Sequence, residues 1–85
     1  MTPFQTAVIA VVKQIPAGTV LSYQGVAAQA GYPNAARAVA NLMARNFDPT
    51  IPCHRVIRSD GTAGGYNRGG EAEKYRRLVA EGVTL

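Results

Sequence analysis

The sequence predicts a mainly α fold with a small β element, arranged as a helix-turn-helix (winged-helix-like) domain. Apolar residues recur at helical spacing in four separate segments of the chain. The signals for strands are only two residues long, at positions 20–21 and 56–57. A short turn that contains glycine joins the second and third helical segments, which is the spacing of a helix-turn-helix.

Length and composition support a single folded domain. The 85 residues are too few for a two-domain enzyme, a barrel of alternating strands and helices, or a doubly wound sheet. With 47% hydrophobic and 16% charged residues, the chain lacks the composition of a disordered protein. We therefore expect residues 1–85 to form one domain.

The first predicted helix has a complete start signal. Thr2 is placed to cap it, Pro3 occupies its first position, and Gln5 closes a capping box. We expect this helix over residues 3–15, with one apolar face formed by Phe4, Val8, Val11, Val12 and Ile15.

Two shorter helices are predicted after the strand signal at 20–21. Ser22 is placed to cap a helix over residues 23–30, and Asn34 is placed to cap the next over residues 35–44. The latter has a core face of Ala35, Ala38, Val39, Leu42 and Met43. Its other face, with Arg37, Asn41, Ala44 and Arg45, carries two cations among small side chains, as a recognition helix does. The alternative is an alanine-rich helix whose outer face is only solvated.

The second half of the chain is less regular. Residues 46–50 read as a loop, Asp60 and Gly61 as a turn, and residues 64–70 as a flexible, weakly basic loop. A last helix is predicted over residues 71–81, with Gly82 in the stop position. Its core face is expected to contain Ala72, Tyr75, Leu78 and Val79.

Charge and cysteine usage narrow the class of partner and compartment. Nine Lys and Arg against five Asp and Glu give a net charge of +4, which favours a polyanion such as nucleic acid, although a basic surface kept for solubility is the alternative. A single cysteine cannot form an internal disulfide, so we expect a reducing compartment, either cytoplasmic or nuclear. The apolar run at residues 7–12 is too short for a signal peptide or a membrane span, and no membrane partner is expected.

The only cysteine and the only histidine are adjacent, at Cys53 and His54. Pro52 stiffens the chain before them and Arg55 follows, which gives an electropositive setting that favours a reactive thiolate. The pattern predicts a nucleophile, and the alternative is a cysteine packed as a small hydrophobe. One cysteine and one histidine cannot complete a structural zinc site, so no metal is expected.

His54 would need a partner to act as a base. In an extended segment neighbouring side chains point in opposite directions, so His54 would reach Cys53 through a water or from a local kink. The residues alone leave its orienting carboxylate open among Asp48, Asp60, Glu71, Glu73 and Glu81.

These motifs together resemble a known family. The Pro-Cys-His-Arg-Val motif at residues 52–56 follows an Ala-Arg-Ala-Val motif at 36–39 and Asn46, and precedes Gly65, Tyr66 and the segment 74–81. In this order and spacing the chain resembles the C-terminal active-site domain of the O6-alkylguanine-DNA alkyltransferases, from Phe4 to Gly82. The resemblance implies repair of O6-alkylguanine in double-stranded DNA by one irreversible transfer to Cys53, without a cofactor, by a monomer that binds the minor groove.

The resemblance also implies roles for individual residues. Cys53 would accept the alkyl group, with His54 as its base through a water and Glu81 orienting His54. Tyr23 would lie near the target's 3′ phosphate and the flipped guanine, and Arg37 would fill the vacated place in the base stack. The helix that carries Arg37 would contact DNA through Asn41, Arg45, Ala36 and Ala40 as well. Asn46 would brace the turn before the site, and the backbone carbonyls of Val56 and Cys53 would bind the guanine amine.

Two departures from the family pattern leave alternatives open. The stretch from Asn46 to Cys53 is one residue shorter than in most relatives, and the stretch from Tyr66 onward is one longer. Either Asn67 or Arg68 would therefore be the residue whose amide faces the lesion oxygen. We also expect the chain to lack the N-terminal domain of full-length relatives. A second hypothesis is therefore an alkyltransferase-like protein that flips and flags the lesion without transfer, although such proteins replace the cysteine. A third is a plain helix-turn-helix regulator.

Overall fold

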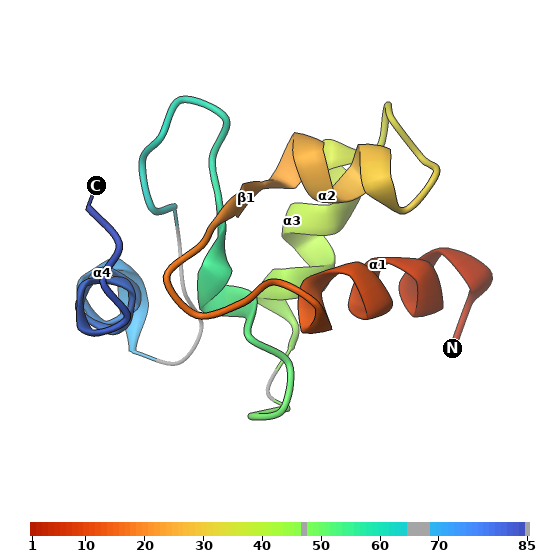
Figure 1. Ribbon diagram of the computed structural model, residues 1–85. Coiled ribbons are helices and arrows are strands. Elements are labelled where there is room, and N and C mark those ends of the chain that lie inside the picture. The colour runs from red at the N-terminus through yellow and green to blue at the C-terminus, as the bar shows by residue number, and fades with distance from the viewer. Residues whose placement is uncertain (47, 65–68, 85) are drawn as a thin grey trace.

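The computed structural model describes residues 1–46, 48–64 and 69–84. Figure 1 shows α4 at one side of the molecule and α1 at the other, with α2 and α3 above α1 and strand β1 on the side that faces α4. The described residues confirm the predicted fold class, because four α-helices surround a sheet of only two short strands.

Helix α1 (Pro3–Lys13) begins as the sequence predicts. The Thr2 hydroxyl accepts a hydrogen bond from the Gln5 backbone N–H at 3.1 Å, and the Gln5 side chain accepts one from the Thr2 N–H at 2.9 Å. The helix ends at Lys13, two residues before the predicted end, but Ile15 is still buried. Val8 and Val12 lie at the centre of the core, together with Val26, Ala27, Val39 and Met43 from the next two helices.

Helices α2 (Tyr23–Gln29) and α3 (Ala36–Ala44) form the helix-turn-helix pair. Ser22 caps α2 as predicted, with its hydroxyl accepting from the Gly25 N–H at 2.8 Å. The predicted cap at Asn34 is wrong: Ala35 holds the N-cap position of α3 and no side chain caps it. The Ala35 N–H is instead bonded to the carbonyl of Tyr32, so a backbone turn replaces the expected side-chain cap. Ala38, predicted in the core, is exposed.

The two strands pair in parallel, although they are far apart in sequence. Strand β1 (Leu21–Ser22) lies beside β2 (Val56–Ile57) in the register Leu21 to Val56 and Ser22 to Ile57. Each strand adjoins a segment with predicted chemistry, because α2 begins directly after β1 and the 3-10 turn η1 (Cys53–Arg55) ends directly before β2. The sheet therefore brings residues near position 23 to residues near position 55.

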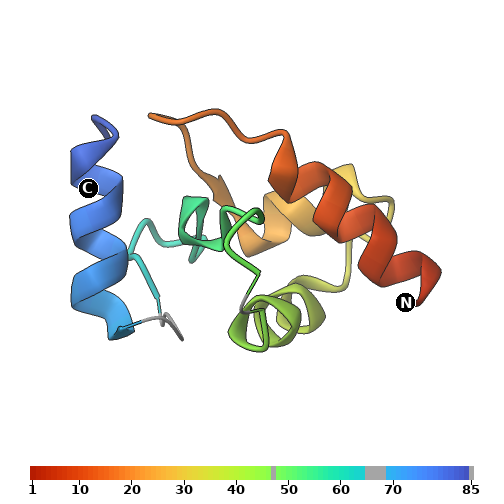
Figure 2. The ribbon, with the colours of Figure 1, turned by 90° about the horizontal axis from the view of Figure 1, so that it is seen from below.

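Helix α4 (Gly70–Ala80) stands at the edge of the molecule, and Figure 2 shows η1 between it and α1. Of the predicted core face only Leu78 is buried, whereas Ala72, Tyr75 and Val79 are exposed. The buried stripe is Lys74 and Leu78, followed by the half-buried Glu81 at the cap. The prediction failed because a lysine and a glutamate occupy positions that the hydrophobic pattern assigned to solvent.

The end of α4 fixes the place of Glu81. The Val83 N–H donates to the Leu78 carbonyl at 3.0 Å and the Gly82 N–H donates to the Val79 carbonyl at 2.9 Å, which is a Schellman motif. Gly82 adopts φ 91°, a conformation that a residue with a Cβ rarely takes. The motif holds Glu81 as the C-cap residue, with its side chain directed to η1.

Candidate functional site

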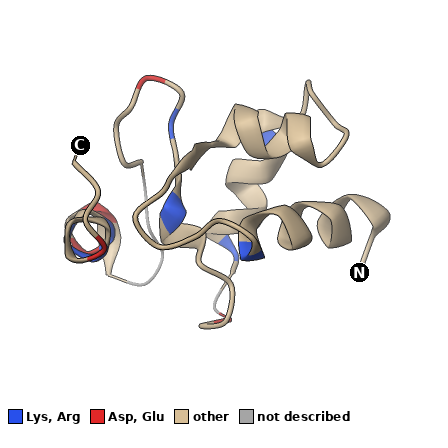
Figure 3. Cartoon of the chain, viewed as in Figure 1, with Lys and Arg blue, Asp and Glu red and all other residues tan. Residues whose placement is uncertain are grey.

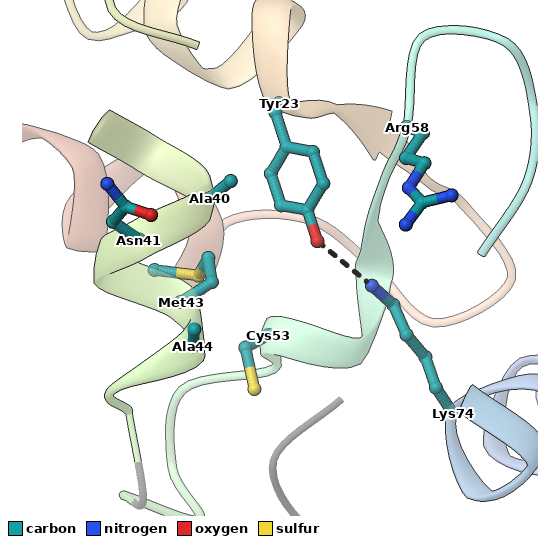
Figure 4. A pocket seen from close by; sticks show the side chains of 8 residues that line it. All are labelled: Tyr23, Ala40, Asn41, Met43, Ala44, Cys53, Arg58 and Lys74. Atoms are coloured by element: carbon teal, nitrogen blue, oxygen red, sulfur yellow. Dashed lines mark hydrogen bonds between the residues drawn. The ribbon is translucent and has the colours of Figure 1, made fainter. Parts of the chain in front are cut away.

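A hollow of about 260 Å³ lies where α2, α3, η1 and α4 approach one another (Figure 4). Figure 4 shows side chains from all of these elements directed into it, from opposite sides. It is lined by Cys53, Tyr23, Lys74, Arg58, Met43 and Asn41, with two alanines of α3. Residues distant in sequence, at positions 23, 53 and 74, thus meet in one small space.

Cys53 is the first residue of η1 and is only 3% exposed. The expectation of an extended segment is wrong here, because residues 53–55 form a 3-10 turn in which the Arg55 N–H donates to the Pro52 carbonyl at 3.0 Å. Of the two alternatives for His54, a water or a local kink, the described backbone shows a kink at residues 53–55. Cys53 lines the hollow, while His54 reaches α4 on another side of the turn.

The partner of His54 is Glu81. The His54 Nε2 atom lies 3.1 Å from Glu81 Oε2, and the other carboxylates that the sequence left open make no such contact within the described residues. Arg55 binds the same carboxylate twice, from Nε to Oε1 at 3.0 Å and from its Nη2 to Oε2 at 2.6 Å, and its Nη1 donates to the Ile15 carbonyl at 2.8 Å. These hydrogen bonds, led by that from Arg55, lower the pKa of Glu81 to about 2. Glu81 is therefore a carboxylate at neutral pH, shared between His54 and Arg55.

Tyr23 and Lys74 form a second polar contact across the hollow. The Lys74 ammonium donates to the Tyr23 hydroxyl at 3.3 Å and lies 5.5 Å from the centre of its ring. Lys74 is 1% exposed, and this burial lowers its pKa to about 8. Burial also raises the pKa of Tyr23 above its usual value, an effect that the charge of Arg58 partly offsets. A neutral phenol thus faces the hollow with a cation directly behind it.

The surface beside the hollow is basic. Residues 1–46 contain three Lys and Arg and no Asp or Glu, and in the described chain Figure 3 shows the acidic residues on α4 and on loops of the second half. The predicted DNA-facing residues Arg37, Asn41 and Arg45 are exposed on α3, and Ala36 and Ala40 are half-buried. A second, shallower hollow joins Arg37, Ala36 and Ala40 to Tyr23 and Arg58.

Of the remaining predicted residues, Asn46 and Val56 lie in the described part of the chain. Asn46 follows α3, and its side-chain oxygen accepts from the Asp48 N–H at 3.0 Å, which orders the turn before η1. Val56 is fully buried in β2. Tyr66, Asn67 and Arg68 lie outside the described residues, so the choice between Asn67 and Arg68 is not tested.

Sequence reasoning assigned no role to Lys74 and did not consider Arg58, although both line the hollow. The signal for Lys74 was its spacing from Leu78 and Glu81 along one helical face. Arg58 gave no such signal, because its neighbours depend on how the two strands pair.

Two kinds of site are missing from the described part of the chain. No group of three His, Cys, Asp or Glu side chains there could hold a metal ion. No helix in that part is long and apolar enough to cross a membrane.

A single nucleophilic sulfur, a histidine with a carboxylate partner and a phenol beside a cation are suited to transfer of a group to Cys53.

Comparison with known proteins shows which family and which relatives the chain is similar to. Residues 3–83 match the model of the family described as 6-O-methylguanine DNA methyltransferase, DNA binding domain. The methylated-DNA–protein-cysteine methyltransferase of Methanothermobacter thermautotrophicus is 52% identical over 85 residues, which is 99% of this chain and 47% of that protein. The rat protein of the same name is 51% identical over 72 residues, which is 84% of this chain and 34% of that protein. The chain thus spans half or less of the length of these curated relatives.

Solved structures give the same picture. The structure of Mycobacterium tuberculosis OGT in complex with DNA has a TM-score of 0.87 at 40% identity, over 95% of this chain and 50% of that one. The Schizosaccharomyces pombe Atl1 protein, in complex with damaged DNA that contains O6-carboxymethylguanine, also has a TM-score of 0.87, at 36% identity, over 99% of this chain and 80% of that one. The helix-turn-helix prediction is therefore confirmed.

Proposed function

The chain belongs to the 6-O-methylguanine DNA methyltransferase family, and on this premise we propose that it repairs O6-alkylguanine in DNA by irreversible transfer of the alkyl group to Cys53. The observation that carries the proposal is the position of Cys53 in the wall of a hollow that adjoins the basic surface of α3. In this proposal the same segment supplies both the DNA-binding helices and the acceptor cysteine. Its partner is double-stranded DNA bound through the minor groove, and it acts as a monomer.

The transfer is a displacement at the alkyl carbon. His54 takes the thiol proton through a water, and the Glu81 carboxylate stabilises the imidazolium that forms. The thiolate then forms the S–C bond while the bond between the carbon and O6 breaks, and the electron pair of that bond leaves with the guanine. Tyr23 gives the departing base a proton, and the Lys74 ammonium stabilises the phenolate through its hydrogen bond. His54 and solvent return the proton to Tyr23, so no cofactor is consumed.

The target base must first leave the duplex. Extrusion costs a few kcal/mol, and a side chain inserted into the stack offsets part of that cost. We assign the insertion to Arg37, which is exposed near the start of α3, and the surrounding DNA contacts to Asn41, Arg45, Ala36 and Ala40. The carbonyls of Cys53 and Val56 would bind the guanine amine.

A second candidate function is recognition of the lesion without transfer. The likeness to Schizosaccharomyces pombe Atl1, which covers most of that protein, favours it. In this case the hollow would bind the flipped base and Cys53 would stay unmodified. The presence of a buried cysteine in the wall of the hollow favours the transfer.

Intact-mass measurement separates the two functions. The protein is mixed with a duplex that contains O6-methylguanine, and transfer is expected to add one methyl group to each protein molecule. Cys53→Ser is expected to bind the duplex with little change but to gain no mass, because a serine hydroxyl is far less readily ionised than a thiol. Binding of the lesion with no added mass on the parent protein would establish the second function instead.

A further inference from the structure

We propose that Arg58 binds a backbone phosphate of the DNA strand whose nucleotide enters the Cys53 hollow. The inference rests on the proposed binding of DNA, but not on the transfer itself. Arg58 is exposed and follows directly after β2, in a segment to which the sequence analysis assigned only a turn.

The parallel pairing of the strands places Arg58 beside Tyr23. Leu21 lies opposite Val56 and Ser22 opposite Ile57, so Tyr23 and Arg58 are the residues that directly follow the two paired strands. Both converge on Gly64: a Cβ at that glycine would lie 3.4 Å from the Tyr23 hydroxyl oxygen and 3.5 Å from Arg58 Nε. Figure 4 shows the guanidinium near the phenol and the Lys74 ammonium, at the side of the hollow away from α3.

Arg58 is also the cation that the two hollows share. It lines the Cys53 hollow together with Lys74, and the shallower hollow together with Arg37. No acidic residue lines either hollow within the described chain. The nearby Asp60 carboxylate accepts from the Thr62 hydroxyl and N–H, and the described residues form no hydrogen bond or ion pair with the Arg58 guanidinium. The guanidinium therefore lies where the two hollows meet, and its N–H donors are available to a ligand.

A phosphodiester suits this position. A nucleotide whose base occupies the Cys53 hollow keeps its sugar and phosphates outside it, and the adjoining shallower hollow is lined by Arg37 and Arg58. A guanidinium binds two phosphate oxygens at once through charge-assisted hydrogen bonds. Such contacts fix the register of the protein on DNA without reading its sequence. Arg58 would thus hold the strand while the base is out of the stack.

The rival explanation is that Arg58 acts on the chemistry. Its charge lowers the pKa of Tyr23, so its loss could slow proton donation instead of binding. The two explanations differ for a free base, which has no phosphate. A free O6-benzylguanine base carries a reactive benzylic carbon and needs no extrusion, so it reports the chemistry alone.

The experiment compares Arg58→Gln with Lys13→Gln, a matched loss of one positive charge at the end of α1, which lines neither hollow. Duplex affinity is measured over a range of salt concentrations in the Cys53→Ser background, so the result does not depend on transfer. Arg58→Gln is expected to weaken duplex binding roughly tenfold near physiological salt and to reduce the salt slope by about 1, as loss of one phosphate contact does. Lys13→Gln is expected to keep the parent slope.

Two further results can support or overturn the proposal. Arg58→Lys keeps the charge and should keep the salt slope, and with Cys53 intact Arg58→Gln should slow the reaction with the duplex more than the reaction with free O6-benzylguanine. An unchanged salt slope in Arg58→Gln, or equal slowing with free base and duplex, would overturn it. Absence of alkyl transfer in the parent would reject the proposed repair activity but leave the salt slope as a valid test of Arg58.

Discussion

The region formed by α1, α2 and α3 is held together differently from the region that attaches α4. The three helices share one apolar core, centred on Val8, Val12, Val26 and Val39, to which Cys53 of η1 and Val56 of β2 also belong. Leu78 is the fully buried apolar side chain of α4, and it lies outside that core. Helix α4 and its cap residue also contact the rest of the molecule through polar pairs, which join Lys74 to Tyr23 and Glu81 to His54 and Arg55.

The difference shows how a small domain combines stability with chemistry. Apolar packing tolerates small shifts and does not titrate, whereas hydrogen bonds between charged groups require fixed geometry and depend on pH. Here the polar contacts that dock α4 are made by the residues proposed to act on the substrate. The helix therefore docks correctly only when those side chains are also correctly placed.

The largest effect is expected from Glu81→Gln. The change removes the charge that orients His54 and takes the carboxylate from the Arg55 guanidinium, so transfer should fall about 100-fold or more and stability by about 2–3 kcal/mol. Single-turnover kinetics and urea unfolding measure the two losses. Glu73→Gln is the matched control, since Glu73 pairs within α4 with the exposed Arg76, and it should change neither quantity. Equal losses in both variants would refute the special role of Glu81.

Val12→Ala should show the opposite pattern. It opens a void in a fully buried part of the α1–α3 core, so stability is expected to fall by about 2 kcal/mol and the melting temperature by roughly 8–16 °C. The transfer rate at a temperature well below melting should stay within about twofold of the parent, because no residue of the hollow is changed. A large loss of transfer in the folded variant would show that the two regions are not separable.

Acid should weaken the α4 contact before the apolar core. The pKa of Glu81 is about 2 in the folded protein and 4.5 ordinarily, so the folded state binds fewer protons between these values. The stabilisation is complete above about pH 5 and is lost as the pH falls toward 2, with about 1–2 kcal/mol gone at pH 3. Urea unfolding at pH 6 and pH 3 measures the loss. The Glu81→Gln variant should lack this component, and an equally steep loss in that variant would assign it to other carboxylates.

The smallest change in stability, and a gain, is expected from Lys74→Met. Burial lowers the pKa of Lys74 to about 8, so at neutral pH the fold carries the cost of a buried ammonium. Methionine removes that cost, and we expect the melting temperature to rise by about 4–8 °C while transfer falls about tenfold. The advantage over the parent should shrink as the pH rises from about 8 to 10.5, where the lysine of the folded state is neutral.

A double-mutant cycle shows whether Lys74 acts through Tyr23. In a Tyr23→Phe background the phenol that Lys74 bonds is gone, so Lys74→Met should cost little further transfer. A full tenfold loss in that background would place Lys74 in direct contact with the substrate instead.

Elements with local causes could be predicted from the sequence alone. The capping box at Thr2, the cap at Ser22 and the stop at Gly82 each depend on residues within a few positions, and all three were predicted correctly. The adjacent Cys53 and His54 likewise suggested the proposed chemistry from the sequence, because both are rare reactive side chains.

Contacts between residues far apart in sequence depend on how the whole chain packs. The parallel pairing of β1 with β2 places Arg58 beside Tyr23, and the docking of α4 selects Glu81 from five acidic candidates and buries Lys74. Hydrophobic periodicity assigns charged residues to solvent, so it predicted Tyr75 and Val79 in the core where the fold placed Lys74. A charged side chain is buried only where another part of the chain supplies its partner, and that partner is fixed by packing over the whole domain rather than by neighbours in sequence.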